Sequence, residues 1–217
     1  LAAQHVALVD RISNALVGLA TQLGLAFWPA GLAVLYPHPG SWPLATVAVA
    51  TAVVAALVAL SLALLRRAPC VAAGIAFFAI GLAPTLGFVP VGFQSTADRY
   101  SYLPQIGVWL ALVFAIPASR ASRAAGLAAC AVALLVFAAI TRAQLAYWRD
   151  DLVLWERAIE VTSDNWFANT EAGIELAARG RNDEALARLS RAVELAPRWE
   201  RAQANLGFVL LRVGRSE

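Results

Sequence analysis

The residues best suited to chemistry lie in one short segment between two apolar runs, Ala97-Asp98-Arg99-Tyr100-Ser101-Tyr102-Leu103-Pro104. Charge beside a bilayer is costly and marks a functional site by default. The Arg99 guanidinium would bind a phosphate or pyrophosphate through two parallel hydrogen bonds. Tyr100 and Tyr102 would anchor at lipid headgroups or stack on a sugar. In the alternative interpretation, Asp98 and Arg99 satisfy each other or a helix end, and the tyrosines form an aromatic belt.

A second polar segment is Tyr36-Pro37-His38-Pro39-Gly40. His38 is able to act as an acid or base near neutral pH, but a histidine between two prolines is more typical of a turn. The sequence offers no carboxylate or metal partner for it, so no catalytic role is assigned to it. Cys70 and Cys130 lie inside apolar runs without a CxxC or Cys/His spacing, which predicts small buried apolar residues and no zinc site.

The elements that carry these segments divide the chain at about residue 147. Seven arginines and two aspartates are the only charged residues up to Tyr147, whereas ten arginines and twelve acidic residues follow it. The basic residues form no run and no aromatic-interleaved patch, which argues against nucleic-acid binding. The composition therefore predicts a membrane domain over 1–147 and a water-exposed domain over 148–217.

Four apolar runs in the first domain are candidates for membrane helices, since about 20 apolar residues cross a bilayer. They cover Leu44–Leu65, Cys70–Phe88 with Pro84 near its end, Leu103–Ala118, and Ala124–Ile140. The uncharged stretch Ile12–Tyr36 is interrupted by Trp28-Pro29 and Gly31. It fits a fifth span, or an interfacial helix followed by a re-entrant turn, and Trp28 and Tyr36 favour the interfacial helix.

Loop arginines predict the orientation of the spans. Arg66-Arg67 and Arg120 with Arg123 lie in short loops, which places those loops in the cytoplasm. The loops 37–43 and 89–102, and everything after the last span, then face outward. Arg99 counts against this orientation, but Asp98 beside it indicates a different role for that arginine.

The second domain repeats with a period of 34 residues. Gly173 aligns with Gly207, Ala168 with Ala202, and Arg157-Ala158 with Arg191-Ala192. This period is typical of tetratricopeptide repeats, in which each unit is a pair of helices. One complete repeat is expected at about 165–198, with the second helix of an earlier unit at about 150–162 and the first helix of another after it. Trp155 aligns with Leu189 and is predicted to be a core residue.

The fold class predicted is therefore all-α: a polytopic transmembrane helix bundle followed by a tetratricopeptide-repeat solenoid. Such arrays bind peptides or proteins along the face formed by the first helix of each repeat. That face is predicted to include Thr170, Glu171, Ile174 and Asn205. The amide of Asn205 would hydrogen-bond an extended peptide, or would simply be solvated. The chain lacks Met and stops part-way into a repeat, so it is expected to belong to a longer protein.

The order of these features resembles the family of transmembrane and tetratricopeptide repeat-containing proteins, which are protein O-mannosyltransferases, and their bacterial relatives. The resemblance is carried by Trp28-Pro29-Ala30-Gly31-Leu32-Ala33, by the segments around His38 and Arg99, and by Trp148 leading into the repeats. It covers essentially the whole chain. The repeats are unspecific, whereas the Asp-Arg-Tyr-x-Tyr-Leu-Pro segment is considerably more specific.

The resemblance implies a C-type polytopic glycosyltransferase of the bacterial inner membrane, which passes a mannose-like sugar from a polyprenyl-phosphate donor to a polypeptide on the outer side. It implies that the catalytic acidic residue lies upstream of Leu1, so this chain alone is expected to be inactive. The charge and position of the outward segment predict that Arg99 contacts the donor phosphate and that Asp98 orients Arg99 or helps to bind a metal or acceptor. No cofactor is indicated by a motif, and a divalent cation is left open. The alternative is a non-enzymatic membrane anchor whose repeats recruit a partner in the cell envelope.

Overall fold

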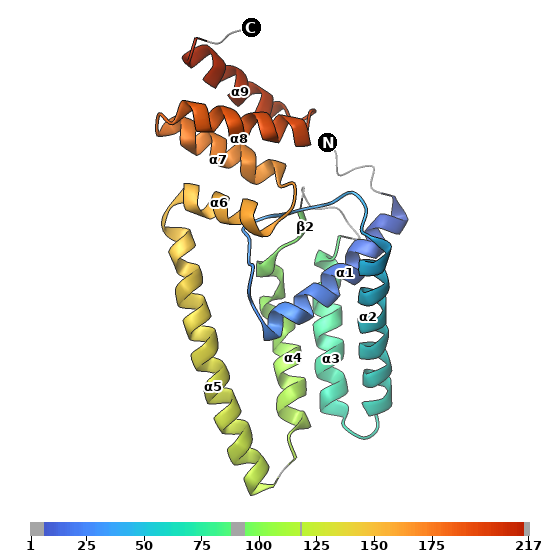
Figure 1. Ribbon diagram of the computed structural model, residues 1–217. Helices are drawn as coiled ribbons and strands as arrows, with labels where there is room; N and C mark the ends of the chain where they lie inside the picture. Colours follow the sequence, from blue (N-terminus) through green and yellow to red (C-terminus); the bar gives the residue numbers. More distant parts are fainter. Residues whose placement is uncertain (1–6, 88–93, 118, 215–217) are drawn as a thin grey trace. The chain divides into compact units, whose positions relative to one another are not determined.

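The computed structural model describes residues 7–87, 94–117 and 119–214, and these are mostly helical. The chain forms two compact units (Figure 1). The N-terminal unit comprises residues 1–30 and 38–141, and the C-terminal unit comprises residues 31–37 and 142–217. Each unit is described by itself.

Helices make up most of the N-terminal unit. Its elements are α1 (Leu8–Phe27), α2 (Leu44–Leu64), α3 (Pro69–Leu82), the 3₁₀ turn η2 (Ala83–Thr85), the short strand β2 (Gln94–Thr96), the 3₁₀ turn η3 (Asp98–Ser101), α4 (Tyr102–Ala115) and α5 (Arg120–Gln144), the last residues of which belong to the other unit.

Prolines determine where several of these helices begin or end. Pro69 begins α3, where its missing N–H costs nothing. Residues before a proline avoid the helical conformation, so α1 ends before Trp28 and α4 before Ile116.

Helix α1 packs across α2 and α4 and contributes to the core of this unit (Figure 1). The core consists of apolar residues from α1, α3, α4 and the turn after α3: Ala15, Leu19, Ala26, Phe78, Leu82, Leu86 and Val108. Helices α3 and α4 approach each other closely. A methyl group added at Gly74 would lie 2.5 Å from the Gly107 carbonyl oxygen, and one added at Gly107 would meet the Gly74 carbonyl oxygen. Glycine is required at both positions for the two backbones to approach this closely.

Among the described residues, two helical stretches are long and apolar enough to cross a membrane, Leu44–Leu64 and Arg120–Arg149, and both are almost entirely exposed. The predicted helices at all four runs are present. However, α3 and α4 have 14 residues each, fewer than the roughly 20 that a straight span requires. The 3₁₀ turn at Pro84 ends α3 early, and Phe88 lies outside the described residues. The stretch from Ile12 onward forms one helix that ends at Phe27.

The prediction that the two cysteines are buried is wrong. Cys70 and Cys130 are both exposed free thiols. They lie on faces of α3 and α5 that no element of the described residues covers. Residues of apolar type were expected to be buried inside the protein, but a helix that faces lipid exposes the same residue types.

The C-terminal unit consists of successive helices. Its elements are β1 (Tyr36–Pro37), η4 (Leu145–Arg149), α6 (Asp151–Val161), α7 (Trp166–Ala178), α8 (Asn182–Leu195) and α9 (Glu200–Arg212). Each of the helices α6 to α9 packs on the next one along the chain. They share a core of small and branched apolar residues: Leu152, Ala172, Leu176, Ala177, Ala185, Leu189 and Val209. Trp155 is half-buried and packs against this core.

The 34-residue period is visible in the backbone as well as in the sequence. Gly180 ends α7 with φ of 78°, and Gly214 follows α9 with φ of 71°. The amide of Arg181 donates to the carbonyl of Leu176, and that of Gly180 to Ala177, which closes the helix end in the manner of a Schellman turn. Glycine suits both positions because a side chain would strain a backbone with positive φ.

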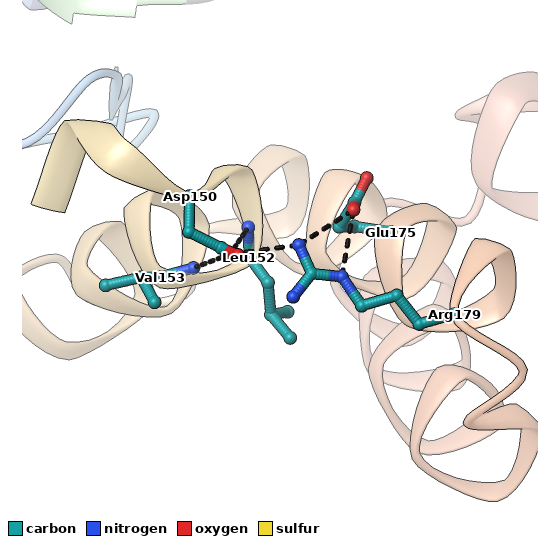
Figure 2. Close-up of polar contacts among 5 residues, drawn as sticks. All are labelled: Asp150, Leu152, Val153, Glu175 and Arg179. Atoms are coloured by element: carbon teal, nitrogen blue, oxygen red, sulfur yellow. Dashed lines mark hydrogen bonds and ion pairs between the residues drawn. The ribbon is translucent and has the colours of Figure 1, made fainter.

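Asp150 begins α6 and ties it to α7, as Figure 2 shows. Its Oδ1 accepts from the backbone amides of Leu152 (2.9 Å) and Val153 (3.2 Å), which caps the helix. The same oxygen accepts from Arg179 Nη2 at 3.0 Å, and Arg179 also pairs with Glu175. One carboxylate therefore both starts a helix and connects it to its neighbour.

Candidate functional site

The segment that carries Arg99 is held by short-range hydrogen bonds. The amide of Tyr100 donates to the Ala97 carbonyl, and the Ser101 hydroxyl donates to the Asp98 carbonyl at 2.7 Å. Gln105 Nε2 then donates to Ser101 Oγ at 3.0 Å from the first turn of α4. These bonds fold residues 98–101 into a 3₁₀ turn that leads directly into α4.

Arg99 has an exposed guanidinium whose direction is set by two neighbours. Its Nη2 donates to Gln94 Oε1 at 3.3 Å, and its guanidinium carbon lies 5.1 Å from the centre of the Tyr100 ring. Gln94 Nε2 donates to the Tyr100 hydroxyl at 2.7 Å, so Gln94 connects the two side chains. A guanidinium has five N–H groups, and a planar, stacked one is well suited to bind a phosphate.

The other residues predicted for this site are placed differently. Asp98 is half-buried and Tyr100 belongs to the Arg99 cluster, whereas Tyr102 is 76% exposed at the start of α4. Tyr102 therefore presents its ring outward from the turn. The predicted outward loop is described only from Gln94 onward, and residues 89–93 lie outside the described part.

Asn14 of α1 fixes the strand that precedes Arg99, a role that sequence reasoning missed. Asn14 is 2% exposed. Its Nδ2 donates to the carbonyls of Ser95 (2.9 Å) and Leu86 (3.2 Å), and its Oδ1 accepts from Trp42 Nε1 at 3.1 Å. The amide thus links α1 to Trp42, Leu86 and Ser95, which lie 28, 72 and 81 residues away from it in the chain.

Gln22, two turns further along α1, holds the same strand. It is 1% exposed, and its Nε2 donates to Thr96 Oγ1 at 3.0 Å, while its Oε1 is buried with no hydrogen-bond partner among the described residues. The one signal in the sequence is that two amide residues, Asn14 and Gln22, stand in a mostly apolar stretch at a spacing that keeps them on neighbouring faces of a helix.

His38 lies in the loop between α1 and α2. It is the first residue of the part of this loop that belongs to the N-terminal unit. Its Nδ1 accepts from the backbone amide of Gly40 at 3.0 Å, which places the proton of the neutral ring on Nε2. Burial lowers the pKa of His38 below its ordinary value, and the negative charge of Asp10 opposes this shift. His38 is therefore a mainly neutral imidazole at pH 7, and Gly40 completes its turn with φ of 83°.

Tyr36 belongs to the C-terminal unit and has a local role. Its hydroxyl accepts from the amide of Ala33 at 2.8 Å and lies 3.5 Å from the carbonyl of Gly31. The carbonyl of Leu35 accepts from Asn165 Nδ2 at 3.1 Å, at the start of α7. These contacts explain why residues 31–37 are part of that unit.

Of the four residues predicted for the peptide-binding face, Thr170 is not accessible. It is fully buried, and its hydroxyl donates to the carbonyl of Trp166 at 2.9 Å. A threonine in a helix commonly satisfies its hydroxyl in this way, so its polarity did not indicate an exposed position. Ile174 is half-buried, and Asn205 is half-buried with its Nδ2 donating to the carbonyl of Arg201 at 2.7 Å.

Glu171 pairs with Arg201 across α7 and α9. Arg201 Nη2 donates to Glu171 Oε2 at 2.9 Å. Burial raises the pKa of the Glu171 carboxyl above its usual value, and the positive charge of Arg201 and its hydrogen bond oppose this shift. The pair therefore helps to hold the two helices together.

Four aromatic side chains form a cluster in the C-terminal unit that the sequence did not indicate: Trp155, Trp166, Phe167 and Trp199. The ring centres of Trp166 and Trp199 are 4.8 Å apart, and those of Phe167 and Trp155 are 5.7 Å apart. Phe167 also lies 5.7 Å from Trp166 and 6.4 Å from Trp199. All four are half-buried, so the cluster combines packing with an accessible aromatic surface.

An apolar cavity of about 530 Å³ lies in the N-terminal unit. It is lined by side chains of α1, α4 and α5 and by the residue after α1: Phe27, Trp28, Trp109, Val132, Val136, Phe137 and three alanines of α5. Trp109 connects the two sides, with ring centres 5.9 Å from Phe27 and 5.7 Å from Phe137. The lining suits a hydrocarbon chain and offers almost nothing to a polar ligand.

Within residues 7–87, 94–117 and 119–214, no three His, Cys, Asp or Glu side chains are grouped as metal ligands would be. Comparison of the chain with protein families, with curated proteins and with solved structures found no match in any of the three.

Proposed function

We propose that this chain is part of a membrane glycosyltransferase, which transfers a mannose-like sugar from a polyprenyl-phosphate donor to protein on the outer face of the bacterial inner membrane. The single observation that carries the proposal is the exposed Arg99 guanidinium, stacked on Tyr100 and bonded to Gln94. An arginine held in this way has little conformational freedom left to lose when it binds a phosphate.

The membrane location is supported by α2 and by the helical stretch from α5 into η4, which are apolar, long enough and exposed. An exposed apolar helix is unfavourable in water and favourable in lipid. Orientation is proposed from the loop arginines: Arg66-Arg67 and Arg120 with Arg123 stay in the cytoplasm, and the Arg99 segment and the helices after α5 face outward.

In this proposal the donor binds at two kinds of surface. Arg99 donates hydrogen bonds to its phosphate, Asp98 keeps the 3₁₀ turn in register through its carbonyl, and Tyr102 is exposed to contact the sugar. The apolar cavity beside Trp109 accepts part of the polyprenyl chain. No proton-transfer residue is proposed among the described residues.

The helices α6 to α9 are proposed to be tetratricopeptide repeats that bind the polypeptide acceptor. The 34-residue spacing of Gly180 and Gly214, both with positive φ, supports repeated helix pairs. Glu171, Ile174 and Asn205 lie on the first helices of their pairs and would contact the acceptor. The pairing of Glu171 with Arg201 means that an acceptor competes with an existing contact.

A second candidate function is a membrane-anchored scaffold without enzymatic activity. The aromatic cluster around Trp166 favours it, because tryptophan and other aromatic residues are enriched where proteins bind one another. This function requires the apolar helices as an anchor and the C-terminal helices as a binding surface, but it requires no role for Arg99.

Because the catalytic acidic residue is expected upstream of Leu1, the deciding experiment uses the intact, longer protein in membranes, with radiolabelled polyprenyl-phosphate mannose, other polyprenyl-linked sugars and total envelope protein. Transfer of label to protein, reduced about tenfold or more in Arg99→Gln, is expected, because a charge-assisted hydrogen bond contributes about 1.5–3 kcal/mol. Arg123→Gln is the matched control, an exposed arginine at the start of α5. No transfer from any donor, with envelope proteins still captured by the chain, would leave the scaffold as the function.

A further inference from the structure

We infer that Asn14 is the positioning residue of the donor site: it holds the Arg99 segment and the His38–Trp42 loop together as a single phosphate-binding unit. The inference rests on the proposed function, because it concerns how Arg99 is presented to a phosphate. It adds two residues, Asn14 and Trp42, to a phosphate-binding site whose other members come from the segment around Arg99.

The hydrogen bonds of Asn14 use its amide completely. Both N–H groups have carbonyl partners, at Ser95 and Leu86, and the oxygen accepts the indole N–H of Trp42. This pattern also fixes which way the amide points, since the reverse orientation would place oxygen against two carbonyls and nitrogen against a donor. A buried amide with every group paired has one favourable position, so it defines the positions of its partners.

The local backbone is shaped to admit this amide. Gly87 has φ of 86°, and a methyl group added there would lie 2.9 Å from Asn14 Nδ2. A side chain at that position would therefore be strained and would also press on the amide. The close approach of Gly87 explains how Asn14 reaches the Leu86 carbonyl from α1.

The connection from Asn14 to Arg99 runs through one short strand. Asn14 holds the carbonyl of Ser95, and Gln22 holds the side chain of Thr96. Gln94, next to Ser95, contacts both Arg99 and Tyr100. Movement of the strand away from α1 would carry Gln94 with it and would release the guanidinium from its fixed direction.

The second connection reaches the loop of His38. Trp42 bonds to the same amide that holds Ser95, so the loop before α2 and the strand before Arg99 meet at Asn14. The loop carries a neutral imidazole with its Nε2–H and the Trp42 ring, which are groups that bind phosphate oxygens and sugar faces. The loop before α2 and the segment around Arg99 were both predicted to face outward. They are thereby joined by Asn14, which belongs to neither of them.

The test measures binding of farnesyl phosphate, a short prenyl phosphate, to the purified whole chain in detergent by calorimetry. Four variants are compared with the wild-type chain: Arg99→Gln, Asn14→Asp, Trp42→Phe, and the double variant Asn14→Asp with Arg99→Gln. Asn14→Asp keeps the acceptor for Trp42 but loses both donors, and Trp42→Phe removes the indole N–H together with the five-membered ring that carries it. Asn169→Asp is the matched control, a buried amide of the C-terminal unit that donates to the Asn165 carbonyl.

If Asn14 positions Arg99, Asn14→Asp and Arg99→Gln each weaken binding about tenfold, Trp42→Phe weakens it several-fold, and the double variant binds no more weakly than the single ones. Hydrogen exchange in residues 94–100 rises in Asn14→Asp and is unchanged in Asn169→Asp. Trp42→Phe is the milder change and serves if Asn14→Asp does not fold.

Two other outcomes are distinguishable. Binding that depends on Arg99 but is unchanged in both Asn14→Asp and Trp42→Phe would overturn the positioning role and leave the proposed function intact. No binding of farnesyl phosphate by the wild-type chain would instead overturn the phosphate site itself, and the inference would fail together with the proposed function.

Discussion

Gly173 lies against Leu189 so closely that the helices α7 and α8 leave no room for a methyl group between them. A methyl group added at Gly173 would be 2.6 Å from Leu189 Cγ and 3.3 Å from the Leu189 amide nitrogen. Leu189 is fully buried and cannot move away without disturbing the core. The structure also contains an equivalent glycine, Gly207, one 34-residue period later, with nothing among the described residues within 4 Å of an added methyl group.

This pair of glycines leads to the first prediction. Gly173→Ala should lower the free energy of unfolding by about 1–3 kcal/mol, as overpacked cores do. Gly207→Ala should be neutral or should raise it by about 0.5–1 kcal/mol, because alanine favours a helix more than glycine does. Thermal unfolding of the two variants, followed by the tryptophan fluorescence of the chain, measures the difference. Equal effects at both positions would show that α7 and α8 pack more loosely than the Gly173–Leu189 distances indicate.

The N-terminal unit allows a parallel prediction for α3 and α4. Gly107→Ala should destabilise this unit by about 1–3 kcal/mol or more, because its methyl group would meet the backbone of α3 rather than a flexible side chain. Gly24→Ala, in α1, is the control, since nothing in the described part of the chain lies within 4 Å of its added methyl group. The measurement is the thermal midpoint in detergent. A Gly107→Ala chain as stable as Gly24→Ala would contradict the close approach.

Acidification should weaken the junction between α6 and α7. The hydrogen bond from Arg179 lowers the pKa of Asp150 below its usual value, and the amide of Val153 acts in the same direction. The folded pKa lies below the unfolded one, so the stabilisation is complete above about pH 5 and is lost below about pH 4, as the carboxylate is protonated. As the pH is lowered below about 4, the thermal midpoint should therefore fall in wild type and fall less in Asp150→Asn, which keeps a capping side chain.

Other carboxylates also contribute to the change of the thermal midpoint with pH. Glu184, hydrogen-bonded to Arg181, has a lowered pKa and contributes in the same direction as Asp150. Glu171 contributes in the opposite direction, because burial raises its pKa and favours the protonated form in the folded chain. Identical pH profiles for wild type and Asp150→Asn would show that the Arg179 contact has no energetic role.

The exposed thiols test the proposed membrane location. Cys130 lies in the middle of α5 and is exposed, so in sealed vesicles it should react with a lipid-soluble maleimide and resist a charged one. Detergent should remove this difference. The test uses a Cys70→Ser background, and Ser163→Cys, exposed between α6 and α7, is the water-accessible control. If the charged reagent labelled Cys130 in vesicles as fully as it labels the thiol introduced by Ser163→Cys, α5 would be excluded from the membrane.

Comparison of sequence and structure shows which features are local. Apolar periodicity and prolines predicted the helices well, since both act over a few residues, and α6 and α7 lie where the 34-residue period placed them. The role of Asn14 was not predictable, because its partner Ser95 is 81 residues away. Thr170 was misplaced because the helix geometry, and not its polarity, decides that its hydroxyl turns back to the backbone.

The Arg99 segment could be singled out from its sequence because charged residues are rare in the first 147 positions. The geometry of this segment could not be predicted from the sequence, because the direction of the guanidinium depends on Gln94 and Tyr100. These two residues become neighbours only when the 3₁₀ turn forms. Polar residues that support a site from an apolar helix, such as Gln22, are similarly hidden until the packing is known.

The contact between Gly74 and Gly107 constrains how this protein can evolve. Each glycine leaves room for the backbone around the other, so a larger residue at either position meets an obstacle that a change at the other does not remove. The two glycines therefore cannot be replaced one after the other by larger residues while α3 and α4 keep their spacing. Across descendants of this protein, these two glycines should remain invariant, while the exposed alanines, valines and leucines of α2 exchange more freely.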